Sequence, residues 1–195
     1  ADDENGANLA DLWIDNRSVA WSAEEVSAFC NALEGSWPSN IASLDSCEGR
    51  SIVQGTLFHA NDTGTHIINS LWHGIPADAN ADKIWMPEGH SEGRVASAAD
   101  EIVIDAHVVE ALDLSLDDTI TISAGSASLE FTLVGIGYHP LHVFMAPEGS
   151  LFPPEAGQYV VGYVSDSGMA RLTNASLGES NTLLLDVDGT PSFDL

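Results

Sequence analysis

The chain has 195 residues and carries 30 acidic side chains against 5 basic ones, a formal net charge of −25. A surface this negative repels the phosphates of nucleic acids and of anionic lipids, so neither is an expected partner. Hydrophobic residues make up 44% of the chain, which excludes disorder throughout. No apolar run approaches the roughly 20 residues that a helix needs to cross a bilayer.

The acidic residues are spread along the chain rather than gathered in one tail or one dense cluster. This distribution favours adaptation to high salt, because screening removes the repulsion among like charges there. The alternative is a protein that binds cations, for which the sequence offers no concentrated set of carboxylates.

The N-terminal part of the chain predicts a loose leader, then a strand and a helix. Residues 1–8 are acidic and polar, as is typical of an unanchored end. An apolar run predicts a strand over residues 9–15. Ser22 and Glu25 have the spacing of a capping box, and apolar residues then recur at helical intervals. A helix is therefore predicted over residues 23–34.

Three β-like runs follow this helix. They span residues 41–44, 51–59 and 66–75, and a glycine and a proline end the last one. The order strand, helix, strands predicts an α/β lobe over residues 9–76.

A second, mostly β lobe is predicted over residues 77–158. A short strand over residues 101–104 leads to Asp105, which is a good N-cap for a helix that runs to Leu112. Two alternating segments joined by a short connection at residues 124–127 then predict a β-hairpin.

The last part of the chain, residues 159–195, is predicted to return to the first lobe. Strands are expected over residues 159–164 and 182–187, and a short helix over residues 169–177. The preceding stretch, residues 138–154, is rich in proline, histidine and aromatic residues and predicts an irregular loop.

Cys30 and Cys47 are the two cysteines of the chain. Neither belongs to a CxxC pair, so a zinc site made of cysteines is not expected. In an oxidising compartment they are expected to form a disulfide, which for a loop of this size stabilises the fold by about 3 kcal/mol. Two small buried thiols are the alternative.

A set of short motifs runs in order through the second lobe. It consists of Glu88-Gly89, Arg94, Asp100-Glu-Ile-Val-Ile-Asp105, Val109-Glu-Ala-Leu112, Asp118-Thr-Ile-Thr-Ile122 and Phe131-Thr-Leu-Val-Gly-Ile136. This set resembles the extracytoplasmic core domain of FtsX-like and MacB-type ABC transporter permeases. The resemblance covers residues 84–187, whereas over residues 9–75 only the order of the elements agrees. Asp113 and Asp117 stand where that family often has glycine.

The resemblance implies an α+β or α/β, two-lobed domain inserted between two transmembrane helices, on the extracellular or periplasmic face of the membrane. Such a domain is not an enzyme, needs no cofactor, and takes part in export or in transmitting motion across the membrane. Its implied partners are the transmembrane part of the same permease, a second permease subunit, indirectly a cytoplasmic ATPase, and an exported substrate or extracellular partner. A secreted or surface-anchored module that binds a ligand or a metal is the alternative.

The sequence offers no catalytic constellation, since neither GxSxG nor GxxxxGK[ST] occurs in it. Exposed aromatic and apolar side chains often mark binding surfaces, although core packing is the alternative for each tryptophan. The candidate contact residues are Trp37, Trp72, Phe144, Met145, Leu151 and Phe152.

Two groups of histidines have regular spacings. His59, His66 and His73 recur every seven residues, but β-like runs and a glycine interrupt any helix that would align them. His139 and His142 have a ligand-like spacing, but the proline between them prevents a regular helix. We therefore interpret these histidines as surface or structural residues, and no metal site is predicted.

Overall fold

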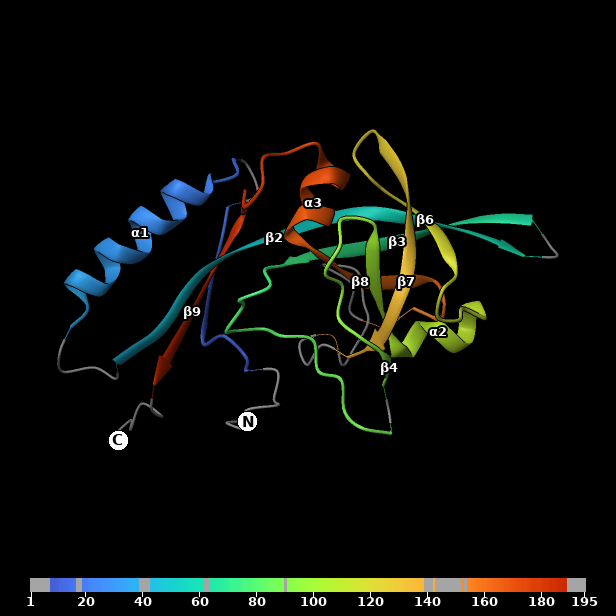
Figure 1. Cartoon of the computed structure of the whole chain (residues 1–195), viewed down its shortest axis with the longest axis horizontal. Helices are drawn as coiled ribbons and strands as arrows, with labels where there is room; N and C mark the ends of the chain where they lie inside the picture. Colours follow the sequence, from blue (N-terminus) through green and yellow to red (C-terminus); the bar gives the residue numbers. More distant parts are fainter. Residues whose placement is uncertain are drawn as a thin grey trace.

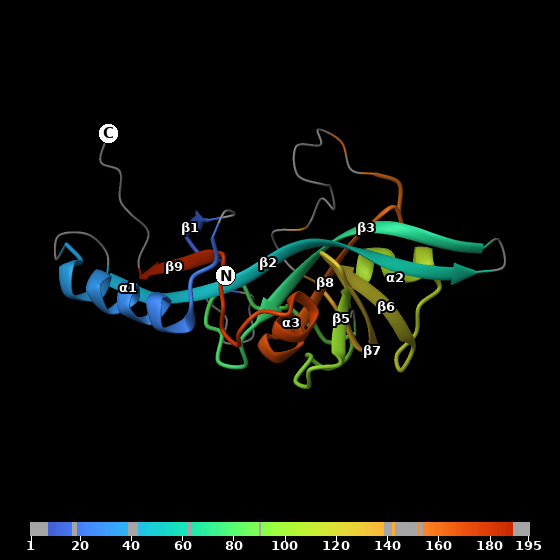
Figure 2. The ribbon, with the colours of Figure 1, turned by 90° about the horizontal axis from the view of Figure 1, so that it is seen from above.

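The computed structural model describes residues 8–16, 19–38, 43–61, 64–89, 91–138, 142, 152 and 154–188. Within these residues the chain forms a strand-rich α+β fold with three helices (Figures 1 and 2). The helices are α1 (Ala23–Ser36), α2 (Ala106–Leu112) and α3 (Asp166–Thr173). The strands are β1 (Leu12–Asp15), β2 (Ser43–Asn61), β3 (Gly64–Ile75), β4 (Glu92–Gly93), β5 (Glu101–Asp105), β6 (Thr119–Ala124), β7 (Ala127–Gly137), β8 (Tyr159–Ser165) and β9 (Thr182–Asp188).

Six of the strands pair in a closed ring. Its order is β2, β3, β8, β5, β7 and β6, and β6 pairs again with β2. The pairs β3–β8 and β5–β7 are parallel, and the other four are antiparallel. Because side chains alternate along each strand, every second residue points into the ring.

The inward side chains form the main core. Bulky apolar residues fill it, and α2 and α3 add side chains to the same cluster from different sides of the ring (Figures 1 and 2). Those from the helices are Val108, Leu112, Met169 and Leu172. Those from the strands that are at most 1% exposed include Leu57, Trp72, Ile102, Ile104, Ile122, Phe131, Leu133, Val160 and Val164.

Before β2 joins the ring, it belongs to a second sheet at one end of the molecule (Figure 1). There β2 pairs with β9, and β9 pairs with β1. Helix α1 lies along one face of this N-terminal sheet. Cys30 of α1 and Cys47 of β2 form a disulfide, with their Cα atoms 5.6 Å apart. Cys30 is also the buried residue of α1, so the disulfide lies on the face of the helix that packs against the sheet.

The opposite face of the N-terminal sheet covers a buried arginine. Arg50 of β2 is 2% exposed, and its Nη2 donates to the Glu48 carboxylate at 2.8 Å and to the Ala81 carbonyl at 2.7 Å. Asp82, also buried, accepts from the Ala10 amide at 3.0 Å. These contacts hold the segment after β3 against the sheet.

Most predicted elements are present, but two differ from the expectation. The runs at 41–44 and 51–59 do not form two strands, because residues 43–61 form the single strand β2. Helix α3 spans Asp166–Thr173, capped by Ser165, rather than residues 169–177. Gly168 in its first turn obscured this start, because glycine is a poor helix former.

The predicted α+β class is confirmed, while the division into two lobes stays a prediction. The C-terminal segment pairs with both parts of the molecule, since β8 lies between β3 and β5 and β9 lies between β1 and β2. Among the described residues, no helix combines the length and the hydrophobicity needed to span a membrane.

Candidate functional site

A pocket of about 600 Å³ lies where the N-terminal sheet meets the outer face of the ring. Its wall combines apolar and polar side chains in similar number, and binding sites for small ligands likewise combine the two kinds. The lining residues are Trp13, Asp15, Ile52, Val53, Gln54, Leu71, His73, His142, Tyr159, Asn181 and Thr182.

Strand register explains why these residues share one surface. Directly paired residues of adjacent strands point to the same face of a sheet. Ile52 of β2 pairs with His73 of β3, and His73 pairs with Tyr163 of β8, so all three belong to the outer face of the ring. Asn181 continues the sheet with its side chain, which accepts from the Ile52 amide at 2.9 Å and donates to the Ile52 carbonyl at 2.7 Å.

Two histidines meet in the pocket wall. The Nε2 atoms of His73 and His142 are 3.0 Å apart, and the two rings are arranged edge to face. His73 is 2% exposed, and burial lowers the pKa of His142 to about 4. The ring of His142 is therefore neutral at neutral pH, and one ring donates a hydrogen bond to the other.

Further buried polar side chains, those of Tyr163 and Asp105, follow His73 along the outer face of the ring. The Tyr163 ring lies 5.5 Å from the His73 ring, centroid to centroid. Burial, and next the charge of Asp105, raise the pKa of Tyr163 well above its usual value. Asp105 is itself buried and accepts from His107 through the backbone amide at 3.0 Å and through Nδ1 at 2.6 Å. Asp105 thus acts as the predicted N-cap of α2.

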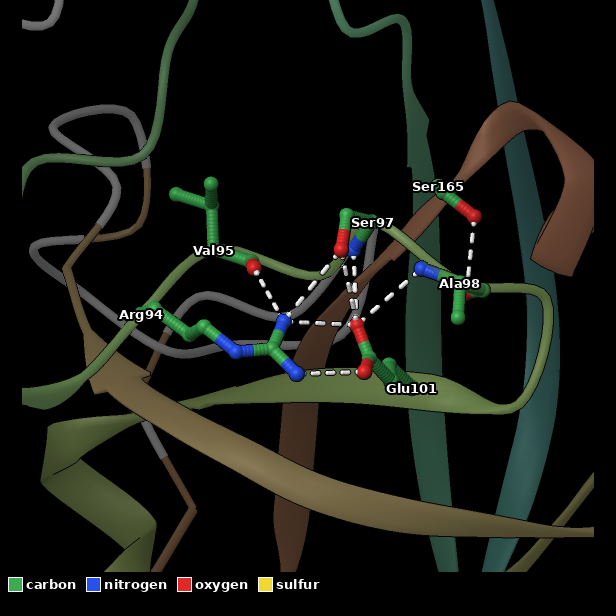
Figure 3. A network of polar contacts seen from close by, with 6 residues as sticks. All are labelled: Arg94, Val95, Ser97, Ala98, Glu101 and Ser165. Atoms are coloured by element: carbon green, nitrogen blue, oxygen red, sulfur yellow. Dashed lines mark hydrogen bonds and ion pairs between the residues drawn. The ribbon is translucent and has the colours of Figure 1, made fainter.

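A second polar network holds the segment before β5 (Figure 3). Arg94 makes a bidentate salt bridge with the Glu101 carboxylate. The same carboxylate accepts hydrogen bonds from the backbone amides of Ser97 and Ala98. The Arg94 guanidinium, followed by the Ala98 and Ser97 amides, keeps the pKa of Glu101 well below its usual range. Ser165 donates to the Ala98 carbonyl at 3.0 Å, which links the segment to α3. This network is a structural anchor, and it uses the arginine and the glutamate of the motif set.

Part of the predicted contact surface is wrong. Trp72 is 0% exposed, packs inside the ring, and donates from Nε1 to the Ser123 carbonyl at 2.9 Å. It cannot touch a partner, because its side chain is one of the inward-pointing residues of β3, and core packing, the alternative for each tryptophan, applies to it. Trp37 is half-buried at the C-terminal end of α1, and Phe152 is 78% exposed. Phe144, Met145 and Leu151 lie outside the described residues.

None of the predicted contact residues that the structure describes lines the pocket. The candidate contact residues did not include three residues of the pocket wall. These are Trp13, which is 37% exposed, and the pair His73 and His142. Alternation along β2 and β3 could have assigned His73 to the outer face. His142, the partner of His73, lies 69 positions away in the sequence, so no local pattern predicts this contact.

Comparison with known proteins gives matches in structure but none in sequence. No protein-family model matches the chain, and no curated protein matches it in sequence. It is similar in structure to extracytoplasmic domains of ABC-type transporters. The extracellular domain of the noncanonic ABC-type transporter YknZ from Gram-positive bacteria aligns with a TM-score of 0.49 and 12% identity, covering 88% of this chain and 75% of that one.

Two further solved structures align with the chain. The periplasmic region of MacB from Actinobacillus actinomycetemcomitans has a TM-score of 0.45 and 13% identity, covering 94% of this chain and 75% of that one. A domain of a protein described as a permease, from Porphyromonas gingivalis, has a TM-score of 0.41 and 11% identity, covering 84% and 68%. All three TM-scores are below 0.5, so we draw no conclusion about function from these likenesses.

Proposed function

We propose that this chain is the extracellular or periplasmic domain of an ABC transporter permease of the FtsX-like or MacB-type family. In this role it catalyses no reaction. It takes part in export, or in transmitting motion between the membrane and partners outside it.

The observation that carries the proposal is the pairing of the first and last described strands (Figure 2). β1 and β9 are antiparallel, and Leu12 at the start of β1 pairs with Leu185 in the second half of β9. The Asp11 amide donates to the Leu185 carbonyl at 3.0 Å, and the Val187 amide donates to the Asp11 carboxylate at 2.9 Å. The start of β1 and the end of β9 therefore lie close together, which suits a domain inserted between two successive transmembrane helices.

The ordered motif set gives independent support. Its residues perform structural tasks in the fold: Arg94 and Glu101 anchor a segment, Asp105 caps α2, and Gly135 lets β7 pass close to the Arg94 backbone. At Gly135 a Cβ atom would lie 2.1 Å from the Arg94 carbonyl oxygen, so a larger residue does not fit. A motif set that serves folding in this way fits a module whose work is mechanical rather than chemical.

The partners follow from the proposed role. They are the transmembrane part of the same permease, a second permease subunit and, through these, the ATPase on the opposite side of the membrane. An exported substrate or an extracellular partner is expected to contact the pocket edge at Trp13, which is the exposed aromatic residue beside the cavity.

Lys83 allows a direct test of location, because it is the single lysine of the chain and is partly exposed. Cells that make the full-length protein are treated with a membrane-impermeant amine reagent, intact or after lysis, and the Lys83 peptide is quantified by mass spectrometry. We expect equal labelling in both samples, with Lys83→Arg as the unlabelled control. Labelling that requires lysis would contradict an extracytoplasmic location.

A second candidate function is a secreted or surface-anchored module that binds a small ligand, and the pocket of about 600 Å³ favours it. The two functions differ in membrane attachment. In the transporter role the full-length protein stays with the membrane after a wash at high pH, because apolar spans hold it on both sides. A secreted module would be released into the medium or the wash.

A further inference from the structure

The geometry of the pocket wall points to a metal site: we propose that His73 and His142 bind a divalent transition metal ion, Zn²⁺ or Cu²⁺, through their Nε2 atoms. The proposal is independent of the transporter role, since it concerns the folded domain alone. It also differs from the sequence-based interpretation, which compared His73 with His66 and His142 with His139 but did not bring His73 and His142 together.

The distance between the two nitrogens suits two ligands of one ion. Zinc binds imidazole nitrogen at about 2.0–2.1 Å, so two ligands of a tetrahedral zinc lie about 3.4 Å apart. The Nε2 atoms are 3.0 Å apart. To admit the ion, each ring moves by about 0.2 Å and turns so that its Nε2 lone pair faces the ion, given that bond length. The ring that donates the hydrogen bond from Nε2 shifts to the tautomer with its proton on Nδ1, which frees Nε2 as a ligand. Two nitrogens on opposite sides of the ion would lie about 4 Å apart. The observed 3.0 Å therefore favours adjacent positions around the ion.

The His73 ring is held in place before any ion arrives, and the His142 ring contacts it edge to face. His73 lies near the C-terminal end of β3, where the strand pairs with β2 on one side and β8 on the other, and its ring packs beside Tyr163. His142 contributes its ring from a segment far away in the sequence. A ring that the fold already holds loses little conformational entropy on binding, unlike a flexible surface side chain.

The chemistry of the donors selects the ion. Imidazole binds zinc, copper and nickel well, whereas calcium and magnesium prefer oxygen ligands. Within the residues that the structure describes, no third histidine, cysteine or carboxylate joins a group that could hold a metal. The pocket beside the rings has room for water molecules as the remaining ligands, so the ion keeps open positions.

The chain offers a matched control in a second histidine pair. His59 and His66 face each other across β2 and β3 and line a separate pocket of about 460 Å³. The His66 side chain is exposed and that of His59 is half-buried, so ordering both rings around an ion costs more entropy. This pair tests whether any two neighbouring histidines are enough to bind the ion.

The test measures Zn²⁺ binding to the metal-free domain by isothermal titration calorimetry at high salt, which suppresses weak binding to the acidic surface. We expect wild type and the double variant H59Q/H66Q to bind with the same affinity. His73→Gln and His142→Gln should each bind at least about tenfold more weakly, since even loss of an outer partner of a ligand costs that much. Equal affinity of all four proteins would overturn the proposal. So would a larger loss of Zn²⁺ affinity in H59Q/H66Q than in His73→Gln and His142→Gln.

A second measurement needs no variant and remains decisive if His73→Gln or His142→Gln does not fold. The imidazole ¹⁵N signals of the wild-type domain are followed by NMR while Zn²⁺ is added. We expect the Nε2 signals of His73 and His142 to move together and saturate, and Ca²⁺ to leave them unchanged. Movement confined to His59 and His66, no movement at all, or an equal response to Ca²⁺ would each show that the pair is a hydrogen-bonded contact and not a metal site.

Discussion

At the scale of single residues, the molecule depends on a few buried charges in a strongly acidic chain. Arg50 is the clearest case, because it is buried and contacts both Glu48 and the Ala81 carbonyl. Burial lowers the pKa of Arg50, whereas the charges of Glu48, Asp82 and Asp166 raise it. The arginine thus offsets the repulsion among several carboxylates that meet behind the N-terminal sheet.

Arg50→Met should therefore destabilise the fold strongly. Removing one partner of a buried charged group leaves the others uncompensated and costs about 3–5 kcal/mol. Arg171→Met is the control, because Arg171 is exposed. Its stacking on Phe131 contributes only about 1 kcal/mol, and its hydrogen bonds to the Ala99 and Glu130 carbonyls are exposed to solvent. The free energy of unfolding in urea at high salt measures both changes. Equal losses would show that Arg50 does not have this special role.

Asp82 predicts a pH dependence. Its pKa is raised from 3.8 to about 6, chiefly by burial, while the Ala10 amide and Arg50 act to lower it and Glu48 and Asp186 to raise it. The folded state thus binds more protons than the unfolded state between these two values. The stability that comes from neutral Asp82 is complete below about pH 4 and is lost as the pH rises through about 6.

Asp82→Asn should remove this dependence, because asparagine stays neutral and tolerates the left-handed backbone at this position, where φ is 46°. Relative to wild type, the variant should gain stability steadily between pH 4 and 6. Urea unfolding at several pH values measures this difference. Parallel curves for the two proteins would contradict the assignment to Asp82.

At the scale of elements, local patterns predicted what local physics controls. The capping box of Ser22 and Glu25, the Asp105 cap and the hairpin of β6 and β7 all depend on residues a few positions apart, and the structure has them. The continuous strand β2, the parallel pair β3–β8 and the contact of His73 with His142 depend on distant segments. The sequence alone could not predict these, because their cause is tertiary packing.

Gly55 illustrates this difference. Glycine inside a strand usually weakens it, but Gly55 lies where β2 passes close to β6 and to Trp72. A Cβ atom there would lie 1.9 Å from the Ser123 carbonyl oxygen and 2.3 Å from Trp72 Nε1. The glycine therefore permits the ring of strands to close between β2 and β6.

Gly55→Ala should destabilise the domain by about 3 kcal/mol, the upper end of the range for overpacked sites. Gly35→Ala is the matched control, since Gly35 lies in α1 and no atom stands within 4 Å of its added Cβ. That change should raise stability by up to about 1 kcal/mol, because alanine favours the helix. Thermal unfolding at high salt compares the two variants. A Gly55→Ala protein as stable as Gly35→Ala would exclude a tight contact.

At the scale of the whole molecule, charge dominates. With a formal net charge of −25 and few basic groups, repulsion among carboxylates opposes the compact state. The short Debye length of concentrated salt removes most of this repulsion. The acidic composition thus predicts a domain that is most stable in salt, a property that the fold itself neither requires nor explains.

Lowering the salt concentration below about 0.1 M should therefore lower the unfolding temperature, and adding salt should restore it. Sodium chloride and potassium chloride should act alike, since screening depends on ionic strength and not on a specific cation. Thermal unfolding across a salt titration measures the effect. An unfolding temperature that does not change with salt would rule out the proposed adaptation.

The antiparallel pair β1–β9 also has a mechanical consequence. A pull that separates Asp11 from Val187 acts across the strands, so the backbone hydrogen bonds between them are loaded one after another. Bonds loaded in sequence open at lower force than bonds that share the load. Tension on the two connections would peel this edge of the sheet first and leave the ring of six strands intact.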